Sequence, residues 1–97
     1  MPTFATTDRF MRDYARLGYP ERASFRDARK HFVDDLKSKR GFRPGLRVKG
    51  VQGAPGVYEM TWAGNGRATW QYGPAQVAGE PHVIWRRIGG HEIFGQP

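Results

Sequence analysis

The spacing of the apolar residues changes partway along the chain, and this change constrains the fold more than any other feature. Up to about residue 45, apolar residues recur every three or four positions, the spacing of a helix with one apolar side. From Leu46 onward they alternate with polar residues in short segments separated by glycine and proline, the pattern of strands. We therefore expect a chain of the α+β class, with helices first and a sheet after them.

Two amphipathic helices are predicted in the first half. The first covers residues 8–17, between a Thr-Thr-Asp start and Gly18, and residues 3–5 before it fit an edge strand. The second begins near Pro20, because proline suits a first helical turn, and ends before residues 41–44. The apolar stripes consist of Phe10, Met11, Tyr14 and Leu17 in the first helix and Phe25, Ala28, Phe32 and Leu36 in the second.

Four strands are predicted in the second half, over residues 46–49, 57–62, 67–72 and 81–88. The turns between them are rich in glycine, and Gly64-Asn65-Gly66 is a strong hairpin signal. We expect a four- to five-stranded, mainly antiparallel sheet with the helix hairpin packed on one face. At 97 residues, the chain (1–97) fits a single domain.

Alternation along the strands assigns side chains to two faces of the sheet. The apolar face collects Leu46, Val48, Tyr58, Met60, Trp62, Ala68, Trp70 and Tyr72. The opposite face collects Arg47, Lys49, Glu59, Thr61, Arg67, Thr69 and Gln71, a set rich in cations and hydrogen-bond donors. In the last strand we expect Ile84 and Ile88 to point inward and Trp85 and Arg87 to lie on the polar face, which leaves Arg86 in need of a partner.

The charge and the absence of cysteine narrow the function. Sixteen Lys and Arg residues against nine Asp and Glu give a net charge of +7, which favours a polyanionic partner: nucleic acid, the ribosome, an anionic membrane or an acidic protein. With no cysteine, disulfides, thiolate zinc sites and a cysteine nucleophile are excluded. No segment resembles a membrane span or a signal peptide, so we expect a cytoplasmic protein with no membrane partner.

Two segments carry a resemblance to a known family. The ending Val-Ile-Trp-Arg-Arg-Ile-Gly-Gly-His-Glu-Ile-Phe, residues 83–94, has a strand, arginines, a glycine turn, His91 and a closing aromatic. Residues 46–53 and 57–60 give a basic strand, a glycine and a second strand. In this order they resemble the RelE/ParE superfamily of bacterial type II toxins, particularly members similar to RelE, YoeB and YafQ.

The resemblance implies an mRNA endoribonuclease that acts in the ribosomal decoding site and is inhibited by a cognate antitoxin. RNA supplies its own nucleophile, the 2′-hydroxyl, so this chemistry requires no metal and no cofactor. Two departures stand out: Thr61 occupies a place where similar toxins have arginine, and Arg67 and Ala68 stand where several relatives have histidine or an acidic residue.

The resemblance also implies roles for individual residues. His91 is the expected general acid, with Arg67 and Arg87 as phosphate ligands and Arg47 and Lys49 as contacts to the adjoining RNA backbone. Three roles stay open: Trp85 and Phe94 either stack on bases or fill the core, and Glu59 is either the base or a salt-bridge partner. Two other functions also stay open, a ParE-like inhibitor of DNA gyrase that cuts no RNA, and a non-catalytic basic module that binds nucleic acid.

Overall fold

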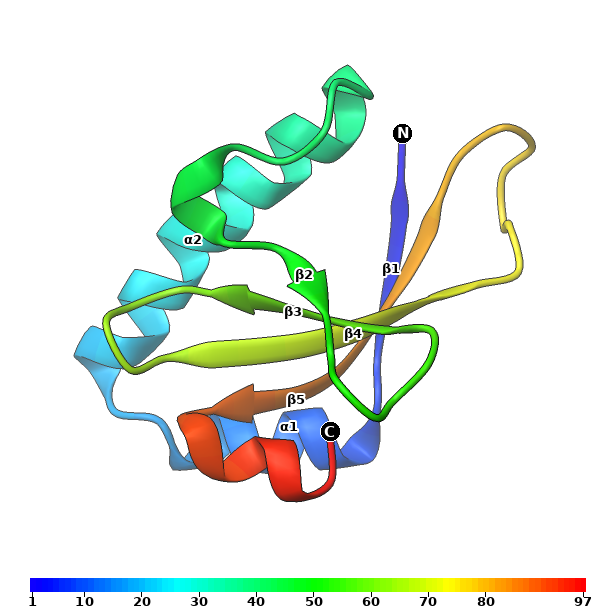
Figure 1. Ribbon diagram of the computed structural model, residues 1–97. Helices are drawn as coiled ribbons and strands as arrows, with labels where there is room; N and C mark the ends of the chain where they lie inside the picture. Colours follow the sequence, from blue (N-terminus) through cyan, green and yellow to red (C-terminus); the bar gives the residue numbers. More distant parts are fainter.

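A computed structural model describes all 97 residues and shows two helices packed on a five-stranded sheet (Figure 1). The α+β prediction is confirmed. In chain order the elements are β1 (Thr3–Thr6), α1 (Asp8–Arg16), α2 (Tyr19–Ser38), the 3-10 turn η1 (Pro44–Leu46), β2 (Lys49–Gly50), β3 (Val57–Thr61), β4 (Arg67–Gly73), β5 (His82–Gly89) and the 3-10 turn η2 (His91–Gly95). Neither α-helix has the length and the hydropathy that crossing a membrane requires.

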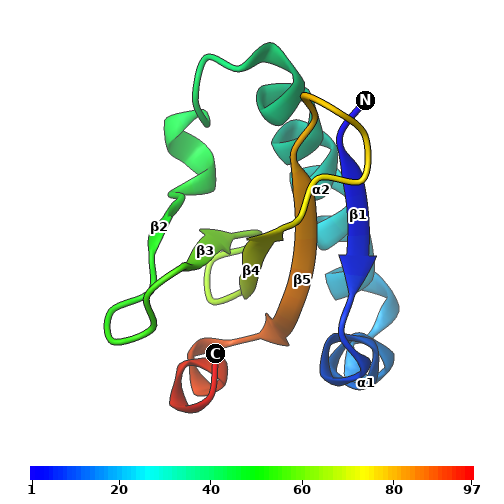
Figure 2. The same ribbon diagram turned by 90° about the vertical axis from the view of Figure 1, so that its right-hand side faces the viewer.

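The sheet has the order β1-β5-β4-β3-β2. Neighbouring strands are antiparallel except at one edge, where β1 pairs with β5 in parallel. In Figure 2, α2 and η2 lie on opposite sides of β4. The sheet therefore has one face covered by a long helix and one polar face that η2 covers in part.

The core forms where aromatic residues of the helices meet tryptophans of the sheet. Phe32 on α2 packs against Trp70 and Trp85, with ring centroids 4.8 and 5.0 Å apart, and Phe25 lies 5.6 Å from Trp85. Phe10 on α1 joins this cluster from the side of β5. The predicted stripes on both helices are thus confirmed as the faces that hold the helices on the sheet, except at Met11, which is 51% exposed.

A β-bulge changes the expected faces of β5. Thr69 pairs with Arg87 while Trp70 pairs with Trp85, so Arg86 is an extra residue that shifts the alternation by one. Trp85 and Ile88 both point into the core, at 3% and 2% exposure, and Ile84 is only half-buried. The placements of Trp85 on the polar face and of Ile84 in the core were wrong, and Trp85 is a core residue with no surface for stacking on a base.

The segment before β2 also differs from the prediction. Residues 46–48 do not form a strand, and β2 begins only at Lys49: Leu46 ends η1, and Arg47 follows with φ of +50° in the left-handed region. Proline at the start of the turn favours this local helix over a strand. Leu46 is nevertheless buried in the core, as the apolar pattern predicts.

Candidate active site

One hollow on the polar face brings together most of the residues predicted for the site. Its volume is about 320 Å³. The residues that line it are Arg47, Val48, Lys49, Glu59, Thr61, Arg67 and His91. They come from four separate parts of the chain, the segment after η1, β3, the start of β4, and η2, so the fold assembles this hollow from residues distant in sequence.

Strand register explains why these residues converge. Arg67 pairs with Thr61 on one side and with Gly89 on the other, so the first residue of β4 lies beside the last residue of β5. His91 follows Gly89 by two residues and begins η2. On the next row of the same face, Lys49 pairs with Glu59. The hairpin of β3 and β4 therefore brings Arg67 to the glycine turn that carries the histidine.

The turn before His91 is closely covered by the Glu92 side chain and is held by its carboxylate. A Cβ atom on Gly90 would approach Glu92 Oε2 to 2.6 Å, and one on Gly89 would approach Glu92 Oε1 to 2.8 Å. The Gly90 backbone N–H donates to Glu92 Oε1 at 3.0 Å, and backbone hydrogen bonds from Gly90 and Glu92 lower the pKa of this carboxyl. Glu92 thus stabilises the tight turn that directs His91 toward the hollow.

The hollow carries excess positive charge. Arg47, Lys49 and Arg67 face the single carboxylate of Glu59, and none of these four belongs to any of the three ion pairs of the structure. Arg67 Nη1 donates to the carbonyl oxygens of Gly64 and Gly66, at 3.3 and 2.9 Å, which leaves Nε and Nη2 without protein acceptors. This arrangement can bind a phosphate group.

Phe94 lies beside the histidine and lines a neighbouring hollow. The rings of His91 and Phe94 are 5.8 Å apart in an edge-to-face arrangement. Phe94 borders a second hollow of about 380 Å³ that shares Lys49 and Glu59 with the first. Its ring is half-buried, so part of it remains available to a ligand.

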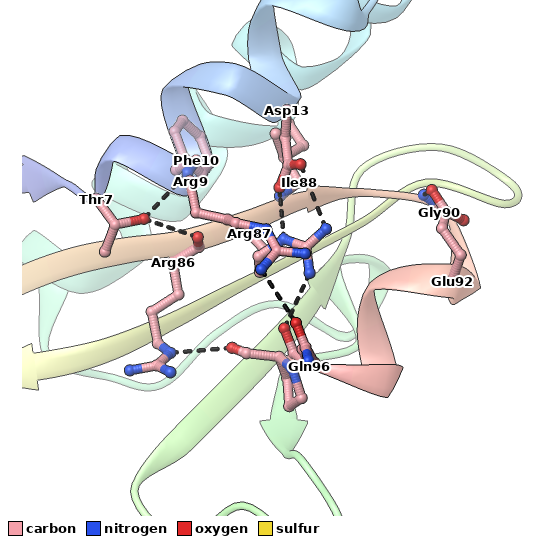
Figure 3. Close-up of polar contacts among 11 residues, drawn as sticks. Thr7, Arg9, Phe10, Asp13, Arg86, Arg87, Ile88, Gly90, Glu92 and Gln96 are labelled. Carbon is pink, nitrogen blue, oxygen red and sulfur yellow. Dashed lines mark hydrogen bonds and ion pairs between the residues drawn. The ribbon is translucent and has the colours of Figure 1, made fainter.

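Arg87 is held outside the His91 hollow by an ion pair with α1 (Figure 3). Its Nε donates to Asp13 Oδ2 at 2.6 Å and its Nη1 to the Gln96 carbonyl oxygen at 2.9 Å. The side chains of Arg87 and Asp13 are only 12% and 8% exposed. Asp13 also accepts the backbone N–H of Ile88 at 3.2 Å. The structure therefore brings Arg67 to His91 but does not bring Arg87 there.

The sequence analysis missed the roles of Asp13, Arg9 and Arg86. Asp13 stands three residues after Phe10 and one before Tyr14, so it lies on the apolar stripe of α1, and its position there was a usable signal of a buried partner. Arg86, expected to point inward, instead donates to the Gln71 side chain and to the Pro97 carbonyl oxygen. No sequence signal places Arg9 beside Arg86.

The structure contains no cluster of three or more His, Cys, Asp or Glu side chains that could bind a metal ion.

Comparisons with known proteins identify the fold. The sequence matches no family model and no curated protein. Solved structures do match: a copper-bound mutant toxin from Helicobacter pylori has a TM-score of 0.67 and 14% identity over 95% of this chain and 97% of that one. The DinJ–YafQ toxin–antitoxin complex from E. coli has a TM-score of 0.65 and 11% identity, over 94% of this chain and 93% of the matched one. The YoeB/ParE toxin from Agrobacterium tumefaciens has a TM-score of 0.65 and 12% identity, over 92% of this chain and 98% of the matched one. The chain thus has the RelE-like fold of these toxins.

Proposed function

We propose that this chain is the toxin of a type II toxin–antitoxin system and cleaves mRNA on the ribosome. The observation that carries the proposal is the shared hollow of His91 and Arg67, in which a proton donor and a phosphate ligand face an unpaired carboxylate, Glu59. The RelE-like fold and the net charge of +7 support the same conclusion.

The first step forms a bond within the RNA. The 2′-hydroxyl oxygen attacks the adjacent phosphorus, and its proton passes to the Glu59 carboxylate, the only carboxylate in the hollow. Charge that develops on the non-bridging phosphoryl oxygens is stabilised by the Nε and Nη2 donors of Arg67 and by the Lys49 ammonium. Arg47 holds the adjoining backbone.

The second step breaks the bond from phosphorus to the 5′ oxygen. The protonated imidazole of His91 gives its proton to that oxygen as it leaves, which yields a 2′,3′-cyclic phosphate and a free 5′-hydroxyl. Histidine suits this task because its pKa is usually close to neutral pH. His91 is exposed, so a substrate can reach it without rearrangement of the core.

Phe94 and Arg87 have different parts in this proposal. Phe94 stacks on a base next to the scissile bond, because its ring borders the hollow that continues from the reactive one. Arg87 does not contact the scissile phosphate, because Asp13 and Gln96 engage its guanidinium outside the hollow. Of the two arginines predicted as phosphate ligands, only Arg67 therefore stabilises the negative charge of the transition state.

The proposal includes an antitoxin and a cytoplasmic site of action. Several proteins with this fold were solved as toxin–antitoxin complexes. For this chain, we infer an acidic antitoxin segment that covers the polar face, where Arg47, Lys49 and Arg67 have no ion-pair partner.

Expression of the chain in bacteria tests the function. The protein is expected to arrest growth and to leave messages cut at mapped positions, whereas His91→Ala lowers cleavage at least about 100-fold, the usual contribution of a general acid. Arg67→Ala is expected to cost about 2–4 kcal/mol of transition-state stabilisation. His31→Ala is the control, because this exposed histidine on α2 lies outside the hollow.

The alternative functions predict other outcomes. A gyrase inhibitor arrests growth with intact messages, and a binding module neither arrests growth nor needs His91. Arrest without cleavage, or cleavage by His91→Ala at the rate of the unaltered protein, would reject the proposed enzyme. Circular dichroism of each variant shows whether its fold is retained.

A further inference from the structure

A second cationic hollow lies beside the two residues that follow η2, Gln96 and Pro97. Its volume is about 400 Å³, and Arg9 of α1 and both Arg86 and Arg87 of β5 line it (Figure 3). None of these arginines lines the His91 hollow. The β-bulge makes this cluster possible, because it places two consecutive arginines of β5 on one side of the sheet.

Oxygens of the last two residues meet the three guanidinium groups. Arg9 Nη1 donates to the Gln96 side-chain oxygen at 3.1 Å, Arg87 Nη1 to the Gln96 carbonyl at 2.9 Å, and Arg86 Nε to the Pro97 backbone oxygen at 3.0 Å. Asp13 is the only side-chain carboxylate bound to the three, and it pairs with Arg87 alone. The side chains of this cluster therefore carry an excess of positive charge that favours an anion.

The two cationic hollows and the hollow beside Phe94 follow one another along β3, and this row of three hollows is called the trough below. The middle hollow shares Lys49 and Glu59 with the first and no lining residue with the arginine hollow. Thr61 and Glu59 line the first hollow, Glu59 lines the middle one, and Val57 lines the arginine hollow. The opposite wall follows η2 and the chain after it in the same direction, with His91, then Phe94, then Gln96.

The length of the trough exceeds one nucleotide. Four residue steps of a strand from Thr61 to Val57 cover about 13 Å. This distance corresponds to about four nucleotides at the roughly 3.4 Å spacing of a stacked strand, and to fewer in an extended one. A ligand that fills the trough is therefore a short single strand with phosphates at both ends and bases between them.

We propose that the hollow of Arg9, Arg86 and Arg87 binds a phosphate of the RNA strand several nucleotides from the bond that is cut. This inference rests on the proposed function for the position of the scissile phosphate. The phosphate replaces the two Gln96 oxygens that accept from Arg9 and Arg87, because hydrogen bonds from guanidinium to a charged oxygen are stronger than those to a neutral one. A strand bound at both ends is fixed in register over His91, with Phe94 beneath a base between them.

Oligonucleotide binding tests the site without requiring cleavage. Single-stranded RNA of two and of six nucleotides, with 2′-O-methyl groups to prevent the reaction, is titrated by fluorescence anisotropy at several salt concentrations. The test variant is Arg9→Ala, because Arg9 is exposed and its only hydrogen bond is to Gln96. Arg12→Ala is the matched control: it removes the same charge from the same helix, but Arg12 does not line the hollow.

We expect the effect of Arg9→Ala on affinity to depend on the length of the RNA. Arg9→Ala weakens binding of the hexamer about 3- to 10-fold and lowers the slope of log affinity against log salt by about 0.7, the value for one contact to a single strand. Arg9→Ala leaves the affinity for the dinucleotide unchanged, and Arg12→Ala changes the affinity for neither oligonucleotide. Equal binding of both lengths by the unaltered protein, or the same loss in Arg9→Ala and Arg12→Ala, would overturn the inference. If Arg9→Ala loses affinity for the hexamer only, and the unaltered protein does not cut RNA, the ribonuclease proposal is rejected and the phosphate site is retained.

Discussion

Asp13 shows how one residue links the helix layer to the polar face. Its carboxylate accepts from Arg87 and from the Ile88 backbone N–H, where β1 has ended and α1 takes its place along the edge of β5. The polar residue within an apolar stripe was visible in the sequence, but its partner was not, because Arg87 lies 74 residues away. Which residues pair across so long a stretch of sequence depends on how the strands and helices are arranged, and the pattern of apolar residues predicts the elements but not their exact register.

Replacement of Asp13 measures the strength of this link. Asp13→Ala leaves a guanidinium and a backbone N–H unpaired in a largely buried place, so we expect a loss of about 3–5 kcal/mol in the free energy of unfolding. Asp8→Ala, in the exposed first turn of the same helix, is expected to cost less than about 1 kcal/mol. Urea denaturation compares the two. Equal small losses would show that the ion pair contributes nothing to the fold.

Asp35 gives a prediction for acid conditions. Hydrogen bonds from the Arg43 side chain and backbone hold the pKa of Asp35 at about 2, below its usual 3.8. Because the folded value is the lower one, this carboxylate stabilises the fold above about pH 4, and the contribution disappears as pH falls toward 2. In Asp35→Asn the urea midpoint should therefore fall less steeply between pH 4 and 2. A slope equal to that of the unaltered protein would contradict this account.

At the scale of elements, alternation predicts the sheet well but cannot locate the bulge. The strands 57–62, 67–72 and 81–88 were predicted within a few residues, because apolar residues recur at every second position in the first two and turns rich in glycine separate all three. In β5, both alternating sets of side chains contain an arginine, so the sequence pattern alone does not show which set points into the core. The partner strand decides: two tryptophans, Trp70 and Trp85, pair across the sheet in the core.

Two substitutions in β5 distinguish the observed faces from the predicted ones. Trp85→Ala removes a buried ring that packs on Phe10, Phe25 and Phe32, and should cost about 3–5 kcal/mol. Ile84→Ala should cost clearly less, because Ile84 is only half-buried. Chemical denaturation of both variants provides the comparison. A larger loss for Ile84→Ala would support the regular alternation and reject the bulge.

At the scale of the whole molecule, the fold separates stability from the proposed chemistry. One face of the sheet carries the aromatic core under the helices, and the other carries the cations and the histidine. The two-faced sheet and the grouping of Lys49, Glu59 and Arg67 were predictable from the alternation of polar residues, whereas Arg47 joins this group from outside any strand. The exclusion of Arg87 from the His91 hollow and the formation of the hollow of Arg9, Arg86 and Arg87 were not predictable, because both depend on the bulge and on the chain after η2.

The account depends most on His91 as the proton donor to the departing 5′ oxygen, and a modified message tests this directly. In a ribosome complex, the 5′ oxygen at the mapped cleavage position is replaced by sulfur, which departs as a thiolate and needs no proton because thiols are much stronger acids than alcohols. We predict that His91→Ala cuts this message within about tenfold of the unaltered protein, whereas Arg67→Ala remains at least about 100-fold slower. If His91→Ala is as defective on the sulfur-containing message as on the natural one, His91 is not the acid.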